Sequence, residues 1–324
     1  MTLGLHNMKK YYEFSDILIR PIPSKVNSRS DVDISVKLSD DFTLEFPLIA
    51  TPMREIVDGN FAAKLSDLGG IAILHRFYDT HEELVSEIEL LTGKNYGLSI
   101  DLDGDFVKLL QYEPRILTVD IANGYIESLR KRCEEIATFI SKNKLKTLLM
   151  SGNVCTESGV RNLRDSGVNI VRFGLGSGGL CSTRNVTGIG LPTFTALQDC
   201  YEVGDVLIAC DGGIRDSGDF VKAIVGGADL GLAGSIFAQT YESPAKEKIY
   251  GMASQKLNEM MFTRIKSIEG IEKTVEKTKS LEKFVEEFSW GIRSAGTYLN
   301  ATNLNEIRTN SEAVIIGTGS IKNL

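Results

Sequence analysis

A glycine-rich segment in the middle of the chain ends in a thiol. Residues 174–181 read Gly-Leu-Gly-Ser-Gly-Gly-Leu-Cys. Neighbouring N–H dipoles or a cation can ionise a cysteine on such a backbone, and the thiolate is the nucleophilic form. The carbonyl oxygens of Gly176, Gly178 and Cys181 are candidates to coordinate a monovalent cation such as K⁺. Taken alone, Cys181 has one alternative interpretation, an inert small residue.

The groups that could move protons near this thiol do not include a histidine. The chain has three, His6, His75 and His81, and none is close to Cys181 in the sequence. His75 ends an apolar run and is expected to be structural. A Cys–His dyad is therefore poorly supported. The sequence also has no metal-ligand cluster and no Gly-x-Gly-x-x-Gly or Walker loop, so a nicotinamide cofactor would not bind in a Rossmann domain.

Two further glycine-rich loops could bind phosphate. Asp211-Gly212-Gly213 and Ala233-Gly234-Ser235 each follow an apolar run. Glycine lets backbone N–H groups approach phosphate oxygens closely, and the Asp211 carboxylate can accept hydrogen bonds from ribose hydroxyls. Together the loops suggest a nucleotide ligand. The alternative is that these glycines only form tight turns.

The elements that would position these groups alternate along the chain. Short apolar runs, most of them continuous as in strands buried on both faces, occupy residues 46–53, 71–75, 96–100, 116–122, 147–150, 170–174, 206–210 and 230–236. Helical patterns lie between them at residues 61–68, 81–91, 125–143, 157–165, 193–203 and 219–225. This order predicts a single-domain (β/α)8 TIM barrel, whose chemistry gathers at the C-terminal ends of the strands. The two phosphate-type loops follow the seventh and eighth strands, where barrels commonly bind phosphate.

Three regions fit this pattern less closely. Residues 102–110 offer at best a short helix, so a six-stranded open sheet with a small second domain is the alternative fold. Residues 1–45 are expected to form an N-terminal extension or a hairpin that closes one end of the barrel. Residues 245–324 are expected to form a flap and a tail. Within them, residues 245–287 are rich in lysine and glutamate and are predicted to be a solvated helix or a mobile flap.

Composition limits the partners and the compartment. The formal net charge is -7 and the pI about 5.2, so a nucleic-acid backbone or an anionic membrane would meet a repulsive average field. Neither is an expected partner. The cysteines number five, lack Cys-x-x-Cys spacing and do not suggest a secreted disulfide framework. No apolar run reaches the roughly 18 to 20 residues that cross a bilayer, and we expect a cytoplasmic protein.

The segments that carry chemistry resemble one known family. The run from Gly174 to Arg184, followed by Thr187-Gly-Ile-Gly190, resembles the active-site loop of the IMP dehydrogenase and GMP reductase family. Further similar blocks extend over nearly the whole chain: Asp16-Ile-Leu-Ile-Arg20-Pro21, Pro47-Leu-Ile-Ala-Thr-Pro-Met53, Gly69-Gly-Ile-Ala-Ile-Leu-His75-Arg76, Asp120-Ile-Ala-Asn123-Gly124-Tyr125, Tyr250-Gly-Met252 and Gly291-Ile-Arg293-Ser294.

The resemblance implies a barrel that binds a purine mononucleotide and attacks C2 of its base through Cys181. Thr183 and Glu269 match the pair that moves protons on and off the leaving amine. The residues that the resemblance places at the nucleotide are Met53, Ser182, Asp211, Gly212, Gly213, Ala233, Gly234, Met252, Ala253, Ser254 and Lys266. Those it places at the cofactor NADPH are Arg76, Asp120, Ala122, Asn123, Arg184, Ser294, Thr297 and Tyr298, the last three donated by a neighbouring subunit of a homotetramer.

Two missing features favour reduction of GMP over oxidation of IMP. The dehydrogenases of this family usually carry a regulatory CBS domain after the second strand, and here residues 81–91 lead directly into the third. They also carry a flap with an Arg-Tyr pair that activates water, whereas residues 252–269 are too few and contain no such pair. We therefore predict NADPH-dependent reductive deamination of GMP to IMP and ammonia. Oxidation of IMP to XMP with NAD is the alternative.

Some positions depart from the reductase pattern. Lys266 stands where reductases have an arginine beside the base, and Ala253 where they have a serine. Arg54-Glu55-Ile56 replaces a usual Asp-Thr-Val, and residues 315–320 look closer to the dehydrogenases. These departures motivate a second hypothesis, a divergent relative that binds purine nucleotides without turning them over. A third is a phosphosugar-metabolising barrel without thiol chemistry, in which Cys181→Ala would leave activity intact.

Overall fold

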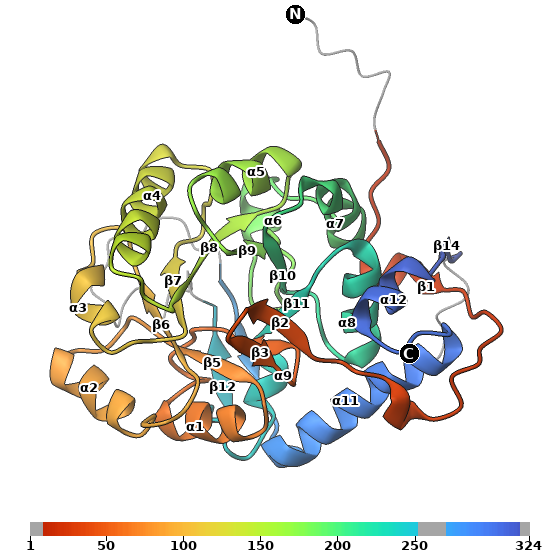
Figure 1. The fold of residues 1–324 in the computed structure, drawn as a ribbon, viewed down its shortest axis with the longest axis horizontal. Coiled ribbons are helices and arrows are strands. Elements are labelled where there is room, and N and C mark those ends of the chain that lie inside the picture. Colours follow the sequence, from red (N-terminus) through yellow and green to blue (C-terminus); the bar gives the residue numbers. More distant parts are fainter. Residues whose placement is uncertain (1–8, 252–269, 318–324) are drawn as a thin grey trace, which may run out of the picture.

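Eight parallel strands close into a barrel in the computed structural model, which describes residues 9–251 and 270–317 (Figure 1). In order around the barrel they are β4 (Leu48–Ala50), β5 (Ile71–Leu74), β6 (Gly97–Ile100), β7 (Ile116–Asp120), β8 (Leu148–Val154), β9 (Ile170–Phe173), β10 (Leu207–Asp211) and β11 (Leu230–Ala233). Each strand overlaps one of the eight predicted runs, and β8 continues past the predicted end at residue 150 to Val154. The predicted (β/α)8 barrel is confirmed.

The barrel closes between its first and last strands. β11 pairs in parallel with β4, and this pairing aligns Leu232 with Ile49 and Ala233 with Ala50. An open sheet would leave the edges of both strands unpaired. The alternative of a six-stranded open sheet is therefore wrong.

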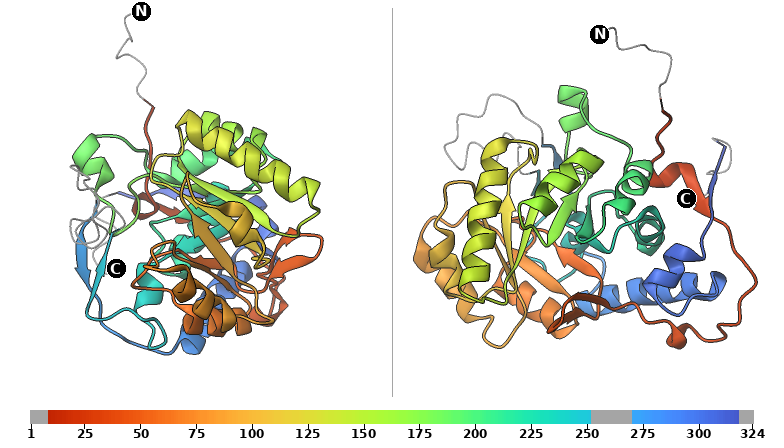
Figure 2. Two further views of the ribbon diagram at one scale, coloured as in Figure 1. Left: turned by 90° about the vertical axis from the view of Figure 1, so that its left-hand side faces the viewer. Right: turned by 45° about the horizontal axis from the view of Figure 1, so that its top comes forward.

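Helices cover the outer face of the barrel (Figures 1 and 2). They are α1 (Gly59–Asp67), α2 (His81–Glu89), α3 (Phe106–Leu110), α4 (Glu127–Lys142), α5 (Glu157–Asp165), α7 (Thr193–Cys200), α8 (Ser217–Gly226) and α9 (Ser235–Ala238). In α1, α2, α5 and α8 an Asp or Thr side chain at the N-cap accepts the N–H of the third helical residue, which fixes where the helix begins. Residues 102–110 form only the short helix α3, as predicted.

A hairpin covers the N-terminal end of the barrel interior. β2 (Val36–Ser39) and β3 (Phe42–Leu44) pair antiparallel. Their side chains Leu38, Phe42 and Leu44 pack in one buried cluster with apolar residues of the barrel strands. The Arg115 guanidinium, just before β7, lies 4.4 Å from the centre of the Phe42 ring. This closure leaves the opposite, C-terminal rim as the face on which chemistry can take place.

The remaining elements lie at the periphery. β1 (Ile17–Ile19) and β14 (Ala313–Ile315) form an antiparallel ribbon, while α11 (Leu281–Tyr298) packs its Phe288 ring 5.9 Å from the Phe220 ring of α8. The last helix is α12 (Leu304–Thr309), and short 3-10 helices span Phe14–Asp16, Arg29–Asp31 and Tyr201–Val203. Within the described ranges, no helix combines the length and the apolar character needed to cross a membrane.

Residues 245–287 were predicted to be a solvated helix or a mobile flap, and the described part of this stretch is helical only from Leu281 onward. β12 (Lys248–Tyr250) and β13 (Glu272–Thr274) form an antiparallel ribbon there, and α11 begins only at Leu281. Ile249 of this ribbon is fully buried, and Lys248 forms an ion pair with Glu272 of the opposite strand. Cross-strand pairing of this kind joins residues far apart in sequence, so it overrides the local helical composition.

Candidate active site

The strand ends bring the predicted site residues to one rim of the barrel. Asp120 is the last residue of β7, Asp211 is the last of β10, and Ala233 ends β11. Met53 follows β4, and Arg76 follows β5. Because the C-terminal ends of parallel barrel strands share one rim, these residues surround a common space. Their predicted placement at strand ends is confirmed.

The thiols of the chain differ sharply in exposure. All five cysteines lie in the described ranges, and only Cys181 is exposed. Burial raises the pKa of Cys133 to about 11 and that of Cys200 to about 12. Burial also raises the pKa of Cys155 and of Cys210. Since the thiolate is the nucleophile, Cys181 is the thiol placed to react.

Thr183 lies next to the Cys181 sulfur. The distance from Cys181 Sγ to Thr183 Oγ1 is 3.1 Å. Thr183 begins the short helix α6 (Thr183–Thr187), and Ser182 immediately precedes it. The Cys181 N–H donates to the Gly178 carbonyl at 2.9 Å, so the loop turns tightly just before the thiol. A hydroxyl in this position can pass a proton to or from a group that reacts at sulfur.

The ribbon of β12 and β13 is hydrogen-bonded to the glycine-rich loop of residues 174–181, which carries Cys181 and is called the catalytic loop below. The Ile271 N–H donates to the Leu180 carbonyl at 3.0 Å, and Gly270 forms an antiparallel bridge with Cys181. The Gly251 N–H in turn donates to the Ile271 carbonyl at 3.0 Å. A Cβ on Gly251 would lie 2.3 Å from the Leu180 carbonyl oxygen, so only glycine allows this approach.

Several predicted residues lie outside the described ranges. They are Met252, Ala253, Ser254, Lys266 and Glu269. Gly270, which pairs with Cys181, directly follows Glu269 in the sequence. The roles of these five residues stay predictions.

The catalytic loop also interlocks with the loop after β10. Gly212 has a φ of +89°, and a Cβ built on it would lie 2.6 Å from the Gly178 nitrogen. The Ser177 hydroxyl donates to the Asp211 carbonyl at 2.9 Å. Glycine at position 212 therefore lets the thiol loop rest directly on the strand end that carries Asp211.

The Asp211 carboxylate is held by two residues to which the sequence analysis gave no role in the site. Arg172 donates to Asp211 Oδ2 from Nε at 3.2 Å and from Nη2 at 2.9 Å. Asn153 Nδ2 donates to the same oxygen at 2.7 Å. Within the described part of the chain, these bonds all converge on Oδ2, which leaves Oδ1 for a ligand such as a ribose hydroxyl. One signal was available: Arg172 is the only charged residue in the apolar run 170–174.

The predicted cofactor residues Arg76 and Asp120 also meet. Arg76 Nε lies 3.8 Å from Asp120 Oδ2, and both atoms are buried without a hydrogen-bond partner in the described structure. A buried polar atom without a partner is costly. Neither atom is exposed at the surface of the described structure, so contact of this pair with a cofactor stays a prediction. Ala122 and Asn123 are exposed in the loop after β7.

The side chain of Arg184 is bonded to three acceptors within the protein. Its Nε donates to the Leu175 carbonyl at 2.8 Å, and its two terminal nitrogens donate to Glu13 and to the Leu191 carbonyl. These three bonds hold the guanidinium against the loop, and its contact with a cofactor stays a prediction. The residue that offers it the carboxylate, Glu13, is far away in the sequence, which is why this pairing could not be predicted.

Ser294, Thr297 and Tyr298 lie apart from the other cofactor residues. They belong to the C-terminal end of α11, beside α8 on the outside of the barrel (Figure 1). Tyr298 is exposed, and the Thr297 hydroxyl donates to the Ser294 carbonyl at 2.7 Å. Within one chain they do not join Arg76 and Asp120, and their contribution from a neighbouring subunit stays a prediction.

The two phosphate-type loops are neighbours. β10 and β11 pair so that Asp211 aligns with Leu232, which brings Gly213 and Gly234 to adjacent strand ends. A Cβ on Gly234 would lie 3.0 Å from Met53 Sδ, so Met53 packs closely on this loop. The structure thus brings these predicted nucleotide residues together, and their contact with a phosphate stays a prediction.

His75 is a core residue. It is buried, stacked on Tyr78 at 4.1 Å between ring centres, and its Nδ1 accepts the Phe77 N–H at 3.1 Å. Burial lowers its pKa to about 3. A ring that stays neutral and packed in this way is structural, as expected from the sequence.

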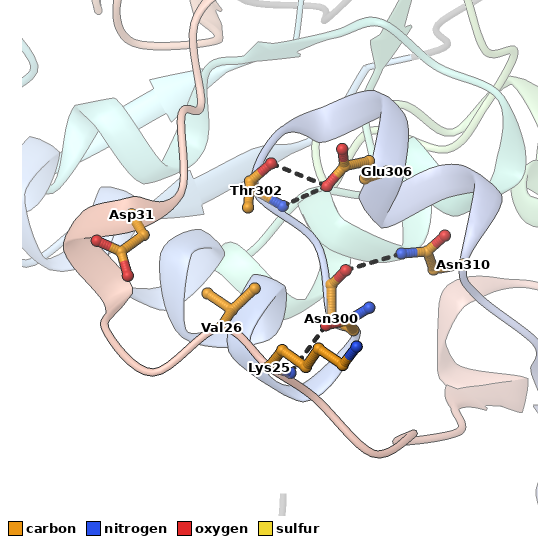
Figure 3. Close-up of a pocket in the computed structure, with 7 residues that line it drawn as sticks. All are labelled: Lys25, Val26, Asp31, Asn300, Thr302, Glu306 and Asn310. Atoms are coloured by element: carbon orange, nitrogen blue, oxygen red, sulfur yellow. Dashed lines mark hydrogen bonds between the residues drawn. The ribbon is translucent and has the colours of Figure 1, made fainter.

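A cavity of about 540 Å³ lies away from this rim (Figure 3). Its lining residues are Lys25, Val26, Asp31, Asn300, Thr302, Glu306 and Asn310. Their polar groups bond to each other, with the Lys25 N–H donating to Asn300 Oδ1 at 2.8 Å and the Thr302 hydroxyl to Glu306 Oε2 at 2.9 Å. None of the predicted site residues lines this cavity, so it is separate from the catalytic rim.

A closed barrel with an accessible thiol, an adjacent hydroxyl and a network of paired carboxylates at its C-terminal rim has the arrangement of a (β/α)8-barrel enzyme. Residues 11–323 match the model of the IMP dehydrogenase / GMP reductase domain, and the chain belongs to this family.

Curated relatives extend over nearly the whole chain. A GMP reductase of Bacillus subtilis (strain 168) is 30% identical over 323 residues, which cover 95% of this chain and 97% of the relative. A GMP reductase of Clostridium acetobutylicum is 30% identical over 317 residues, with 93% and 95% covered. A GMP reductase of Streptococcus equi subsp. equi is 30% identical over 320 residues, with 94% and 95% covered.

Proposed function

We propose that the protein is a GMP reductase, which converts GMP to IMP and ammonia with NADPH as the reductant. The observation that carries this proposal is the exposed Cys181 thiol, 3.1 Å from the Thr183 hydroxyl, on a loop that rests on the Asp211 strand end. The thiol is the nucleophile, the hydroxyl is a proton carrier, and the carboxylate is a ribose anchor. Family membership and relatives named as GMP reductases support the same function.

The first chemical step replaces an amine by a thiol. The Cys181 thiolate attacks C2 of the guanine, a C–S bond forms, and the C2–N bond to the exocyclic amine breaks. The leaving amine takes up a proton and departs as ammonia. Thr183, together with Glu269 as the family resemblance implies, relays the proton that the amine needs.

The second step replaces the C–S bond at C2 by a C–H bond and gives IMP. NADPH, when bound beside Arg76 and Asp120, supplies the hydride that is added at C2. The C–S bond then breaks, the electron pair returns to sulfur, and IMP leaves with the new C–H bond. Arg76 and Asp120 hold the cofactor, while the glycine loops keep the nucleotide in place so that its C2 stays above Cys181.

Hydrolysis of the covalent intermediate has less support than reduction. An IMP dehydrogenase needs an activated water, and residues 252–269 contain no Arg-Tyr pair to activate it. The chain also runs from β5 through α2 directly into β6, with no inserted regulatory domain between them. Reduction needs neither feature.

The proposal extends to the cation and the assembly. The carbonyls of Gly176, Gly178 and Cys181 would bind K⁺, although the Gly178 carbonyl already accepts the Cys181 N–H. Contact of Ser294, Thr297 and Tyr298 with the cofactor would require at least a dimer, and the homotetramer that we propose follows from the family resemblance. Free buried cysteines suit the reducing cytoplasm that we propose as the compartment.

A direct assay separates the two activities. With GMP and NADPH, we expect loss of NADPH absorbance, matched by one ammonia and one IMP per NADPH consumed. Cys181→Ala should abolish it. If GMP gives no turnover while IMP with NAD yields XMP, the protein is a dehydrogenase instead. Tight mononucleotide binding without ammonia release under either condition would support the binding-protein hypothesis, and activity that survives Cys181→Ala would support a phosphosugar enzyme.

A further inference from the structure

Arg172 connects the two carboxylates on which the proposed function depends. It lies on β9 with only 6% of its surface exposed. Nε and Nη2 donate to Asp211 Oδ2, at 3.2 and 2.9 Å, while Nη1 donates to Asp120 Oδ1. One guanidinium thus spans from the strand end of β10 to the strand end of β7.

The charges continue beyond this bridge in an alternating row. Asp120 Oδ2 faces Arg76 Nε at 3.8 Å, and Arg76 Nη1 lies 3.4 Å from Asp101 Oδ2. Burial opposes the charge on Arg172, but Asp211 and Asp120 raise its pKa above the ordinary value, so the guanidinium stays charged. Arg172 and Asp120, at the centre of this row, are buried, so moving one of their charges changes the field and the hydrogen bonds of the other.

The two ends of the bridge point to different ligands. In the proposed function Asp211 anchors the nucleotide ribose and Asp120 lies at the cofactor. A ribose hydroxyl that donates to Asp211 draws electron density from the oxygen that Arg172 holds. A shift in the position of the Arg172 guanidinium then changes the orientation of the Asp120 carboxylate, because the same planar group donates hydrogen bonds to both carboxylates.

We propose that Arg172 is a positioning residue that couples nucleotide binding to cofactor binding, so that each ligand strengthens the binding of the other. This inference rests on the proposed function and adds to it a mutual dependence between the two half-sites. The coupling needs an arginine, since a lysine is a single point charge and cannot donate in two fixed directions to carboxylates on two strands.

The test measures binding without turnover, using IMP and NADPH, a pair that cannot react with each other. In the native enzyme we expect IMP at saturation to lower the Kd for NADPH by about tenfold, within the usual range of coupling between sites. In Arg172→Lys the ratio of Kd values without and with IMP should fall to about one. The effect must be reciprocal, so NADPH should also stop tightening the binding of IMP.

Two further variants make the result decisive. Arg115→Lys is the matched control, since Arg115 pairs with Asp41 at the opposite end of the barrel, at 3.2 Å, and should keep the native ratio. Asp120→Asn is the second probe if Arg172→Lys does not fold. It should weaken IMP binding in the absence of any cofactor, although Asp120 is not a nucleotide residue.

The outcomes are distinguishable. A ratio that stays native in Arg172→Lys, or IMP affinity that is unchanged in Asp120→Asn, overturns the coupling while GMP reduction by the native enzyme still stands. A native enzyme that binds IMP and NADPH independently also overturns it. A native enzyme that binds no purine mononucleotide overturns the proposed function itself, and the coupling with it.

Discussion

The carboxylate and the thiol at the barrel rim are held in opposite ways. Asp211 ends the barrel strand β10, and its carboxylate is fixed by side-chain donors from Arg172 on the neighbouring strand β9 and from Asn153 on β8. Cys181 is exposed on a glycine loop, and the contacts that hold this loop are mostly to its backbone. These contacts come from the β12–β13 ribbon, from the Asp211 backbone carbonyl, which accepts the Ser177 hydroxyl, and from Arg184, which in turn is held by Glu13.

This difference separates binding from reaction. A ligand-anchoring group gains from a rigid, fully bonded support, because its geometry is then set before the ligand arrives. A nucleophile that forms and breaks a bond in each turnover must move by a fraction of a bond length. A loop held by its backbone permits that motion, whereas a buried strand position would resist it.

The largest effect should come from removing the nucleophile. Cys181→Ala should lower kcat by at least about a thousandfold, because no other exposed thiol is available in the described structure. The Asp211 network does not involve the thiol, so nucleotide affinity should change little. Steady-state kinetics and titration with IMP measure the two quantities. A loss of binding as large as the loss of turnover would show that the two regions are not independent.

Substitution of Asp211, which is proposed to anchor the ribose, should weaken nucleotide binding and leave the reactivity of the Cys181 thiol unchanged. Asp211→Asn keeps the shape of the side chain but removes a charged acceptor, so the KM for GMP should rise about 10- to 100-fold. The rate at which iodoacetamide alkylates Cys181 should stay within about twofold of the native rate. A large change in that rate would contradict the separation of anchor and loop.

A substitution in the ribbon should disturb the loop alone. Gly251→Ala places a Cβ 2.3 Å from the Leu180 carbonyl oxygen, which forces the ribbon and the catalytic loop apart. We expect kcat to fall about 10- to 100-fold with little change in the KM for GMP. Gly317→Ala is the control, since a Cβ there meets nothing within 4 Å and the residue follows β14, away from the catalytic loop, and it should behave like the native enzyme. Equal effects of the two substitutions would refute the role of the ribbon.

Removing the carboxylate that holds the Arg184 side chain should have a smaller effect on kcat. Glu13→Gln removes the carboxylate that holds the guanidinium and should lower kcat by about three- to tenfold, because the Leu175 and Leu191 carbonyls still hold the side chain. The affinity for IMP should not change. Glu157→Gln removes an exposed partner of Arg161 on α5 and serves as the control, with no expected change in kcat. A Glu13→Gln enzyme with native kcat would show that this contact does not position the loop.

The last prediction concerns the pH dependence of the free energy of unfolding, to which the buried His75 contributes. The His75 pKa is lowered to about 3 by burial, against about 6.5 in the unfolded chain. Between these values the unfolded chain binds a proton that the native state does not. Stability should therefore fall by up to about 1.4 kcal/mol per unit as pH drops below 6.5. In urea unfolding, His75→Gln should reduce this slope, and an unchanged slope would mean that His75 is not buried as a neutral ring.

The sequence was sufficient for features that depend on local pattern. Continuous apolar runs predicted all eight barrel strands, and the strand ends then located Cys181, Asp120 and Asp211 on one rim. The sequence was not sufficient to predict contacts between segments that are far apart along the chain. The β12–β13 ribbon pairs segments on either side of residues 252–269, and Glu13 reaches Arg184 across the fold.

Arg172 shows a different limit. A charged residue inside an apolar strand is visible in the sequence, but its partners come from β7 and β10 and depend on the closure of the barrel. Only the three-dimensional arrangement shows that one guanidinium serves both Asp120 and Asp211.

The most direct test of the account is to trap the covalent intermediate. The protein is mixed with GMP without cofactor, quenched in acid, digested and analysed by mass spectrometry, and ammonia is measured in parallel. We predict release of ammonia and a purine nucleotide linked to the peptide that contains Cys181, with neither in Cys181→Ala. Ammonia release without an adduct, or an adduct on one of the buried cysteines, would contradict attack on C2 by Cys181.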